Sequence, residues 1–64
     1  MPELNSRAIK RVEYDAQTRR MTIWFPRGNS YDFCGVPPAI YQGLITANSA
    51  GAYYNAHVRD LYPC

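Results

Sequence analysis

The sequence predicts a mostly β fold, a β-rich α+β domain in which a small antiparallel sheet is followed by helical segments. Two patterns support this class: apolar residues alternate with polar ones in the first half, and they recur at helical spacing in the second. With 64 residues, the chain forms one domain with a thin core. We place this single domain at 8–64, after a flexible N-terminal arm at 1–7 that is polar and shows no periodicity.

Alternation of side chains between the two faces of a strand predicts the first hairpin. From Ile9 to Tyr14 the alternation is imperfect, with Val12 and Tyr14 on one side, which is typical of a half-buried strand. The segment 15–18, with the sequence Asp-Ala-Gln-Thr, is polar and typical of a hairpin loop. We therefore expect the chain to reverse here and to pair with the next strand.

A second and a third strand follow, separated by a tight turn. At 21–25 the apolar side chains share one face, whereas Trp24 lies on the other, away from the main apolar row. Gly28-Asn29 provides two residues that tolerate a positive φ, as a tight turn requires. Tyr31 and Phe33 then share one face of the third strand, where we expect them in the core rather than as a stacking platform. Three consecutive antiparallel strands form a meander.

Two helical segments are predicted after the meander. Pro37-Pro38 suits a helix start, because the fixed φ of proline is favourable there and its missing N–H is not needed in the first turn. Asn48-Ser49 provides a cap-like break before the second segment. The end of the pattern is ambiguous, since 58–62 fits either a last helical turn or a closing strand. The apolar positions at helical spacing are Val36, Ile40, Leu44 and Ala47, and then Tyr54, Val58 and Leu61.

The charge is mildly basic, with seven Lys and Arg against five Asp and Glu and a net charge of +2. This is far below the charge density of an obligate nucleic-acid binder. Either the cations form a solvated surface, or their guanidinium groups contact phosphates and stack on aromatic rings. Six of the seven cations lie in the first half of the chain, namely Arg7, Lys10, Arg11, Arg19, Arg20 and Arg27.

The two cysteines, Cys34 and Cys64, either pair or remain free. The sequence shows no signal peptide, no apolar run long enough to span a membrane and no glycosylation sequon. Secreted domains of this size usually carry more than one disulfide, so we expect a cytoplasmic protein with reduced thiols. Neither cysteine belongs to a Cys-x-x-Cys pair and His57 is the only histidine, so we predict no metal site and no cofactor.

To bind RNA, a protein needs cations that follow the phosphates and exposed rings on which unpaired bases stack. Both are available around the first two predicted strands. Trp24 is the candidate stacking ring, unless it packs under the helices. The candidate nucleic-acid-binding residues are Lys10, Arg11, Arg19, Arg20, Trp24 and Arg27.

A secondary polar cluster lies near the end of the sequence. Its members are Tyr53, Asn55, His57 and Arg59, which share one face if the segment is extended. In a helix, Tyr53 and His57 are still neighbours at i and i+4. A His and an Arg can act in a nuclease-like site, but no paired carboxylates, nucleophile elbow or phosphate-binding glycine loop accompany them. We therefore predict that the protein is not an enzyme, and that His57 caps a helix end or bonds to a tyrosine.

In their order and spacing, the motifs of this chain resemble those of the KTSC domain, a short module named for its place at the C-terminus of some lysyl-tRNA synthetases. The resemblance covers nearly the whole chain. The first half carries Ser6, Ile9, Val12-Glu13-Tyr14-Asp15, Ile23-Trp24-Phe25 and Gly28. The central Tyr-x-Tyr motif is Tyr31-Asp32-Phe33 here, which lacks the second hydroxyl, and Glu13 replaces the small residue that is usual before Tyr14. The second half carries Val36-Pro37, Tyr41, Leu44, the run Ser-Ala-Gly-Ala-Tyr-Tyr-Asn at 49–55, and Tyr62-Pro63.

The resemblance implies a small, strongly bent antiparallel sheet, similar to an Sm-like or SH3-like barrel, with a short helical segment inserted before the closing strand. Because no synthetase catalytic portion is present, the chain is similar to the stand-alone bacterial or phage members. The family has no established activity and is regarded as a candidate RNA-binding module. We expect a self-associating domain, a dimer or larger, that binds RNA and not a membrane. Its many Tyr and Arg side chains alternatively suit a protein partner.

Overall fold

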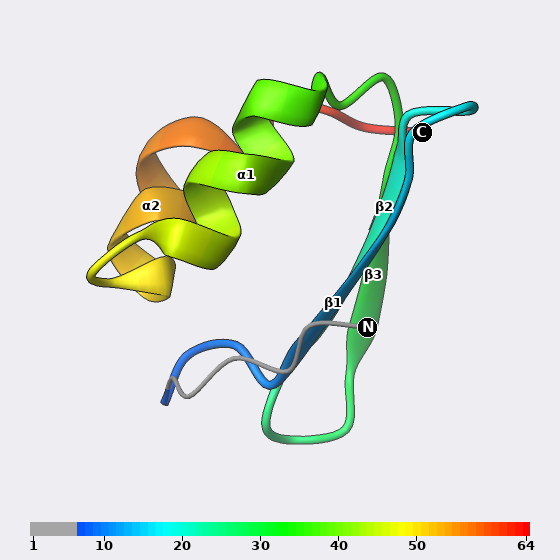
Figure 1. Ribbon diagram of the computed structural model, residues 1–64. Coiled ribbons are helices and arrows are strands. Elements are labelled where there is room, and N and C mark those ends of the chain that lie inside the picture. Colours follow the sequence, from blue (N-terminus) through cyan, green and yellow to red (C-terminus); the bar gives the residue numbers. More distant parts are fainter. Residues whose placement is uncertain (1–6) are drawn as a thin grey trace.

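The computed structural model describes residues 7–64, so most of the arm predicted at 1–7 lies outside the described residues. Within 7–64 the chain forms three strands and then two helices: β1 (Arg11–Asp15), β2 (Arg20–Trp24), β3 (Ser30–Phe33), α1 (Pro38–Thr46) and α2 (Ala50–His57). The strands pair antiparallel in the order β1-β2-β3, which confirms the predicted meander. Both helices lie on the same side of the sheet (Figure 1).

The first hairpin is closed by a side chain of β1. The Asp15 carboxylate accepts hydrogen bonds from the backbone N–H groups of Gln17 at 2.9 Å and Thr18 at 3.4 Å. Arg19 then adopts a positive φ of 60°, which returns the chain into β2. This local turn sets the register in which Arg11 lies opposite Trp24.

The register divides the side chains of the sheet between two faces, because directly opposed residues point to the same side. The inner face carries the apolar pairs, such as Val12 opposite Ile23 and Met21 opposite Phe33, and the helices cover it. The other face, which we call the outer face, has no helix over it (Figure 1). Its residues are Arg11, Glu13, Asp15, Arg20, Thr22, Trp24, Ser30 and Asp32.

The core lies between the inner face and the helices. The Tyr14 hydroxyl donates to the Val36 carbonyl at 2.7 Å, and the Tyr14 ring stacks on that of Tyr41 with centroids 4.6 Å apart. These contacts join β1 to α1 and to the segment before it. Among the residues that the structure describes, no polar or charged side chain is buried. The buried residues are Ile9, Val12, Met21, Ile23, Phe33, Val36, Leu44, Ala50 and Val58.

Both helix starts follow the predicted signals. Pro37 is the N-cap of α1, with proline in the first turn, and the Ser49 hydroxyl caps α2 by accepting from the Ala52 N–H at 3.2 Å. The two helices approach closely where the Tyr53 ring packs on Gly43, a place that a Cβ would fill. Neither of these short helices has the length and apolar character that crossing a membrane requires.

The predicted barrel with a closing strand is wrong, because the sheet is open and residues 58–62 form turns. After α2 the chain bends through Asp60, whose φ is 63°, and the Tyr62 carbonyl accepts a hydrogen bond from the N–H of Cys34, the residue after β3, at 3.0 Å. The prediction that strands contain more residues than helices is also wrong. The helices, of 9 and 8 residues, outweigh the strands, of 5, 5 and 4 residues, so the fold is a small α+β domain.

The expectation of reduced thiols is wrong as well, because Cys34 and Cys64 form a disulfide. Cys34 directly follows β3, and the bond ties the segment after α2 to this edge of the sheet. The pairing could not be deduced from the sequence, since it depends on how the segment after α2 folds back.

The disulfide closes a loop between positions 30 residues apart. Chain-entropy arguments then predict that replacing Cys34 and Cys64 together by Ser lowers the free energy of unfolding by about 3.6 kcal/mol. Urea denaturation of the oxidised protein and of the double variant measures this difference. Reduced wild-type protein should match the double variant, and equal stability of the oxidised and reduced forms would contradict the prediction.

Candidate nucleic-acid interface

A hollow lies at the end of the sheet where β1 begins and β2 ends, and Arg11 and Trp24 of the outer face border it. The hollow measures about 220 Å³, and we call it the Trp24 pocket. Its lining combines two cations with aromatic residues and a turn glycine. The lining residues are Lys10, Arg11, Trp24, Phe25 and Gly28.

Backbone bonds hold the sides of the Trp24 pocket together. The Lys10 N–H donates to the Trp24 carbonyl at 2.8 Å, so the residue before β1 is fixed beside the last residue of β2. On the other side, the Gly28 N–H donates to the Phe25 carbonyl at 3.0 Å. Gly28 has a φ of 88°, a conformation that favours glycine, as the sequence predicts, but Asn29 has no positive φ, and the turn lies one step earlier, at Pro26-Arg27.

Arg11 is the central cation of the Trp24 pocket. Its guanidinium carbon lies 5.1 Å from the centroid of the Trp24 ring, and its Nη2 is 3.0 Å from Glu13 Oε2. Two of the candidate residues, Arg11 and Trp24, are thus in contact with each other. A cation–π contact at an exposed site contributes about 0.5–1 kcal/mol. The Arg11 Nε is buried and, within 7–64, has no hydrogen-bond partner, so one donor of this guanidinium is left unsatisfied.

The predicted binding residues do not form one continuous surface. Lys10, Arg11 and Trp24 meet in the Trp24 pocket, and Arg27 is exposed in the turn next to it. Arg19 and Arg20 lie at the opposite end of the sheet, in and after the β1–β2 turn.

Arg20 is also neutralised on the outer face. Its Nη2 is 2.8 Å from Asp32 Oδ2, while the Thr22 hydroxyl donates to Asp32 Oδ1 at 2.8 Å. These bonds, that from Arg20 above all, lower the pKa of the Asp32 carboxyl below its ordinary value of 3.8. Asp32 therefore stays charged at neutral pH, and Arg20 does not offer a free cation.

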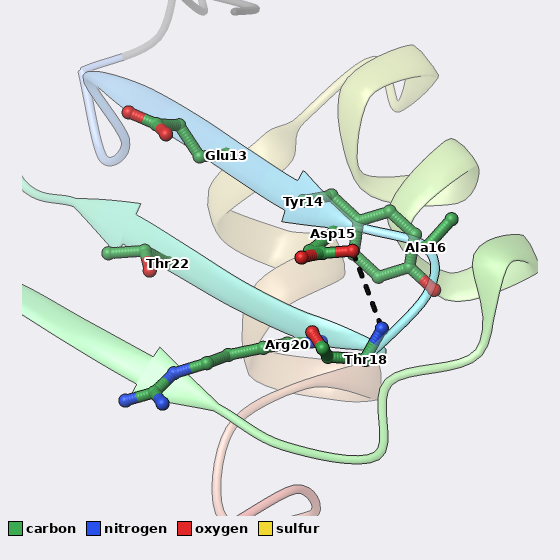
Figure 2. A pocket seen from close by; sticks show the side chains of 7 residues that line it. All are labelled: Glu13, Tyr14, Asp15, Ala16, Thr18, Arg20 and Thr22. Carbon is green, nitrogen blue, oxygen red and sulfur yellow. Dashed lines mark hydrogen bonds between the residues drawn. The ribbon is translucent and has the colours of Figure 1, made fainter.

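A second hollow, of about 430 Å³, lies at the β1–β2 end of the sheet. Figure 2 shows it, with the hydrogen bond between Asp15 and Thr18 at its end. Its lining includes the carboxylates of Glu13 and Asp15, and its one cation is Arg20, which is paired with Asp32. Although larger, this hollow repels phosphate, so we place the nucleic-acid interface at the Trp24 pocket.

The secondary polar cluster is divided by its helix. The rings of Tyr53 and His57 lie 4.6 Å apart, as the i and i+4 spacing predicts. Asn55 is two residues from each of them and so lies on another side of α2, while Arg59 lies beyond the helix and contacts Asp60 at 3.8 Å. The four side chains therefore do not share one face.

Of the two motif aromatics, Phe33 is buried as predicted, but Tyr31 is 56% exposed. The Tyr31 ring packs edge-on against Phe25, which in turn contacts Tyr54. Burial raises the pKa of the Tyr54 phenol, so it keeps its proton at neutral pH. Tyr31 thus lies at the open rim of the inner face, and the prediction that it belongs to the core is wrong.

Sequence reasoning missed the role of Glu13, which holds Arg11 by an ion pair. The signal was present, because residues two apart on a strand point to the same face. It also missed Phe25 and Gly28 as lining residues of the Trp24 pocket. Both belong to the β2–β3 connection, whose path depends on the turn geometry.

Comparison with known proteins identifies relatives over most of the chain. The profile of the KTSC domain family matches residues 5–62. A lysine–tRNA ligase of Nostoc punctiforme is 33% identical over 54 residues, which are 84% of this chain but only 10% of the ligase. A protein of Tsukamurella paurometabola is 30% identical over 62 residues, or 97% of this chain and 92% of that protein.

A solved structure is similar to the fold. The crystal structure of a KTSC domain protein from Yersinia pestis superposes with a TM-score of 0.91 at 24% sequence identity. The match covers 95% of this chain and 86% of that protein. At this identity the similarity establishes the arrangement of strands and helices.

The pair of Arg20 and Asp32 predicts a pH-dependent stability. Because the folded-state pKa of Asp32 is lowered, its stabilising contribution is present above 3.8 and is lost as the pH falls through the folded-state pKa. An Asp32→Asn variant should melt below the wild type at neutral pH, and this difference should shrink well below pH 3.8. Thermal unfolding at the two pH values measures it. A melting difference that is the same at both would contradict the prediction.

Proposed function

This chain belongs to the KTSC domain family, and we propose that it is a non-enzymatic binding module that holds single-stranded or structured RNA at the Trp24 pocket. The proposal rests above all on one observation. An aromatic ring and its cations line a hollow at one end of the sheet, and this ring, Trp24, lies on the face that no helix covers. Rings and cations in this combination suit unpaired bases and their phosphates.

The distribution of charge supports the same end of the sheet. Within the described range 7–64, Arg11, Arg20 and Arg59 are paired with carboxylates, whereas the other cations, Arg7, Lys10, Arg19 and Arg27, make no ion pair. Of these free cations, Lys10 lines the Trp24 pocket and Arg27 lies in the turn next to it, where both can bind the phosphates of a stacked nucleotide. Similarity to part of a lysine–tRNA ligase, whose name includes an RNA, agrees with this ligand class.

The proposal that the protein is not an enzyme rests on the dispersal of the secondary polar cluster. General acid–base chemistry on a phosphodiester requires several groups around one reacting centre. The pair of Tyr53 and His57 lies on α2, on another side from Asn55 and apart from Arg59.

Removing the free cations should weaken RNA binding and its dependence on salt. We expect a Lys10→Ala and Arg27→Ala double variant to lower the slope of log K against log salt by about 1.4, because each phosphate contact with a single strand contributes about 0.7. Fluorescence anisotropy of short labelled RNAs, at low and near-physiological salt, measures the change.

The matched control is the Arg19→Ala and Arg59→Ala double variant, which removes the same charge away from the Trp24 pocket. It should bind RNA nearly as the wild type does. Equal losses in the two double variants would refute this location of the interface. Absence of binding to a varied set of RNAs at both salts would refute RNA as the ligand.

A second function, self-association, is favoured by the apolar side chains at the rim of the inner face. Tyr31 and Leu61 are 56% and 58% exposed, and β3 is an edge strand of the sheet. Aromatic side chains are enriched at protein interfaces, and a domain with a thin core gains stability by burying them. We propose that a second copy of the chain covers these two residues.

Sedimentation equilibrium tests this second proposal. A Tyr31→Ser and Leu61→Ser double variant should be monomeric at concentrations where the wild type forms dimers or larger assemblies, because it removes apolar area from the contact. Trp24→Ala is the control, since Trp24 lies on the outer face, and it should leave the association unchanged. A monomeric wild type at every concentration would exclude self-association.

A further inference from the structure

We infer that the Trp24 pocket holds one unpaired nucleotide, whose base stacks on the Trp24 ring while Arg11 and Lys10 bind its phosphate. The inference rests on the proposed RNA-binding function and specifies the ligand of that site. It makes the domain a reader of bulged, flipped or terminal nucleotides and not of continuous RNA helices.

The size of the pocket limits the ligand. Pockets that bury drug-sized molecules measure about 300–1,000 Å³. At about 220 Å³, the Trp24 pocket is smaller and suits one planar group. The bases of an RNA helix are paired and stacked, so a hollow with an aromatic wall can accept only a base that has left the stack.

The charges on the rest of the outer face disfavour a contact with RNA that extends beyond the Trp24 pocket. Beyond Trp24 the face carries the carboxylates of Glu13, Asp15 and Asp32, and its cation Arg20 is paired with Asp32. A duplex lying along the sheet would bring its phosphates against these carboxylates. The favourable contacts are therefore confined to the end of the sheet with Lys10, and the footprint is short.

Arg11 occupies the position that the base would take. A cation–π contact at an exposed site is weaker than the stacking of a base on an aromatic ring, so a base can displace Arg11 from Trp24. The guanidinium, still held near Glu13, is then free to turn toward the phosphate. This movement also offers an acceptor to the buried Arg11 Nε, which has no partner among the described residues.

Glu13 then acts as a positioning residue that competes with the phosphate for Arg11. In the free protein, the Glu13 carboxylate is 3.0 Å from the guanidinium. A Glu13→Gln substitution keeps the size of the side chain and removes its charge. It should strengthen the binding of an unpaired nucleotide, because the Arg11 charge is no longer neutralised.

The experiment uses the fluorescence of Trp24, the only tryptophan of the chain, as a reporter of its own pocket. Three labelled RNA duplexes are titrated: one fully paired, one with a single unpaired nucleotide, and one in which that nucleotide lacks its base. Label anisotropy measures binding, and tryptophan emission measures stacking. The abasic duplex keeps the phosphates of the bulge, so it isolates the contribution of the base.

We expect the bulged duplex to bind about tenfold tighter than the other two and to quench Trp24, because stacking of one base contributes about that much. The Glu13→Gln variant should bind the bulged duplex severalfold tighter than the wild type, and this gain should exceed the smaller gain for the paired duplex that the loss of one repelling charge produces. Circular dichroism confirms that the variant is folded.

The experiment distinguishes failure of the single-nucleotide inference from failure of the proposed RNA-binding function. If all three duplexes bind alike and the Trp24 emission does not change, the single-nucleotide pocket is refuted while the proposed RNA binding stands. If none of the duplexes and no single strand binds, the proposed function fails, and the inference falls with it. A Glu13→Gln variant that binds the bulged duplex no tighter than the wild type would contradict the displacement of Arg11.

Discussion

The structure depends on the burial of one face of a three-stranded sheet under two short helices. A chain of 64 residues has enough helix to cover the inner face but not the outer one. The inner face is therefore apolar and packs against Leu44 and Val58 in the core. The outer face is exposed to solvent and is mostly polar. Trp24 is the exception on that outer face, because it is a large ring without a helix above it.

The same constraint explains the pattern of charge. On a solvated sheet face, cross-strand and same-strand neighbours pair, as Arg20 does with Asp32 and Arg11 with Glu13. Such exposed pairs contribute little to stability, but they decide which cations remain available. Lys10 lies outside this pairing and borders the Trp24 pocket. The free charge of Lys10 and the ring of Trp24 thus occur at the same end of the sheet, while Arg19, which also makes no ion pair within 7–64, lies at the other end.

The elements set by local signals were predictable from the sequence. The alternation in the first half gives the meander and the outward Trp24, and Ser49 caps the second helix as its residue type suggests. The features that depend on contacts between distant parts of the chain could not be predicted from the sequence. The predicted closing strand is absent because the sequence of 58–62 fits both a helical and a strand periodicity, and the chain turns at Asp60 instead of extending.

The candidate site also combines features that could be predicted from the sequence with features that could not. Arg11 and Trp24 were both predicted as candidate binding residues from their types and strands, but which arginine contacts the ring depends on the register that sets Arg11 opposite Trp24. The neutralisation of Arg20 depends on the register that sets Thr22 opposite Asp32, and no local pattern reveals this. The disulfide and the exposure of Tyr31 likewise depend on where the segment after α2 lies.

Backbone amide shifts in a nuclear magnetic resonance titration with a short single-stranded RNA test most directly the central claim, that RNA binds at the Trp24 pocket. The account predicts that the largest changes cluster at Lys10, Trp24 and Gly28, and changes centred on α2 or on Tyr31 would contradict it.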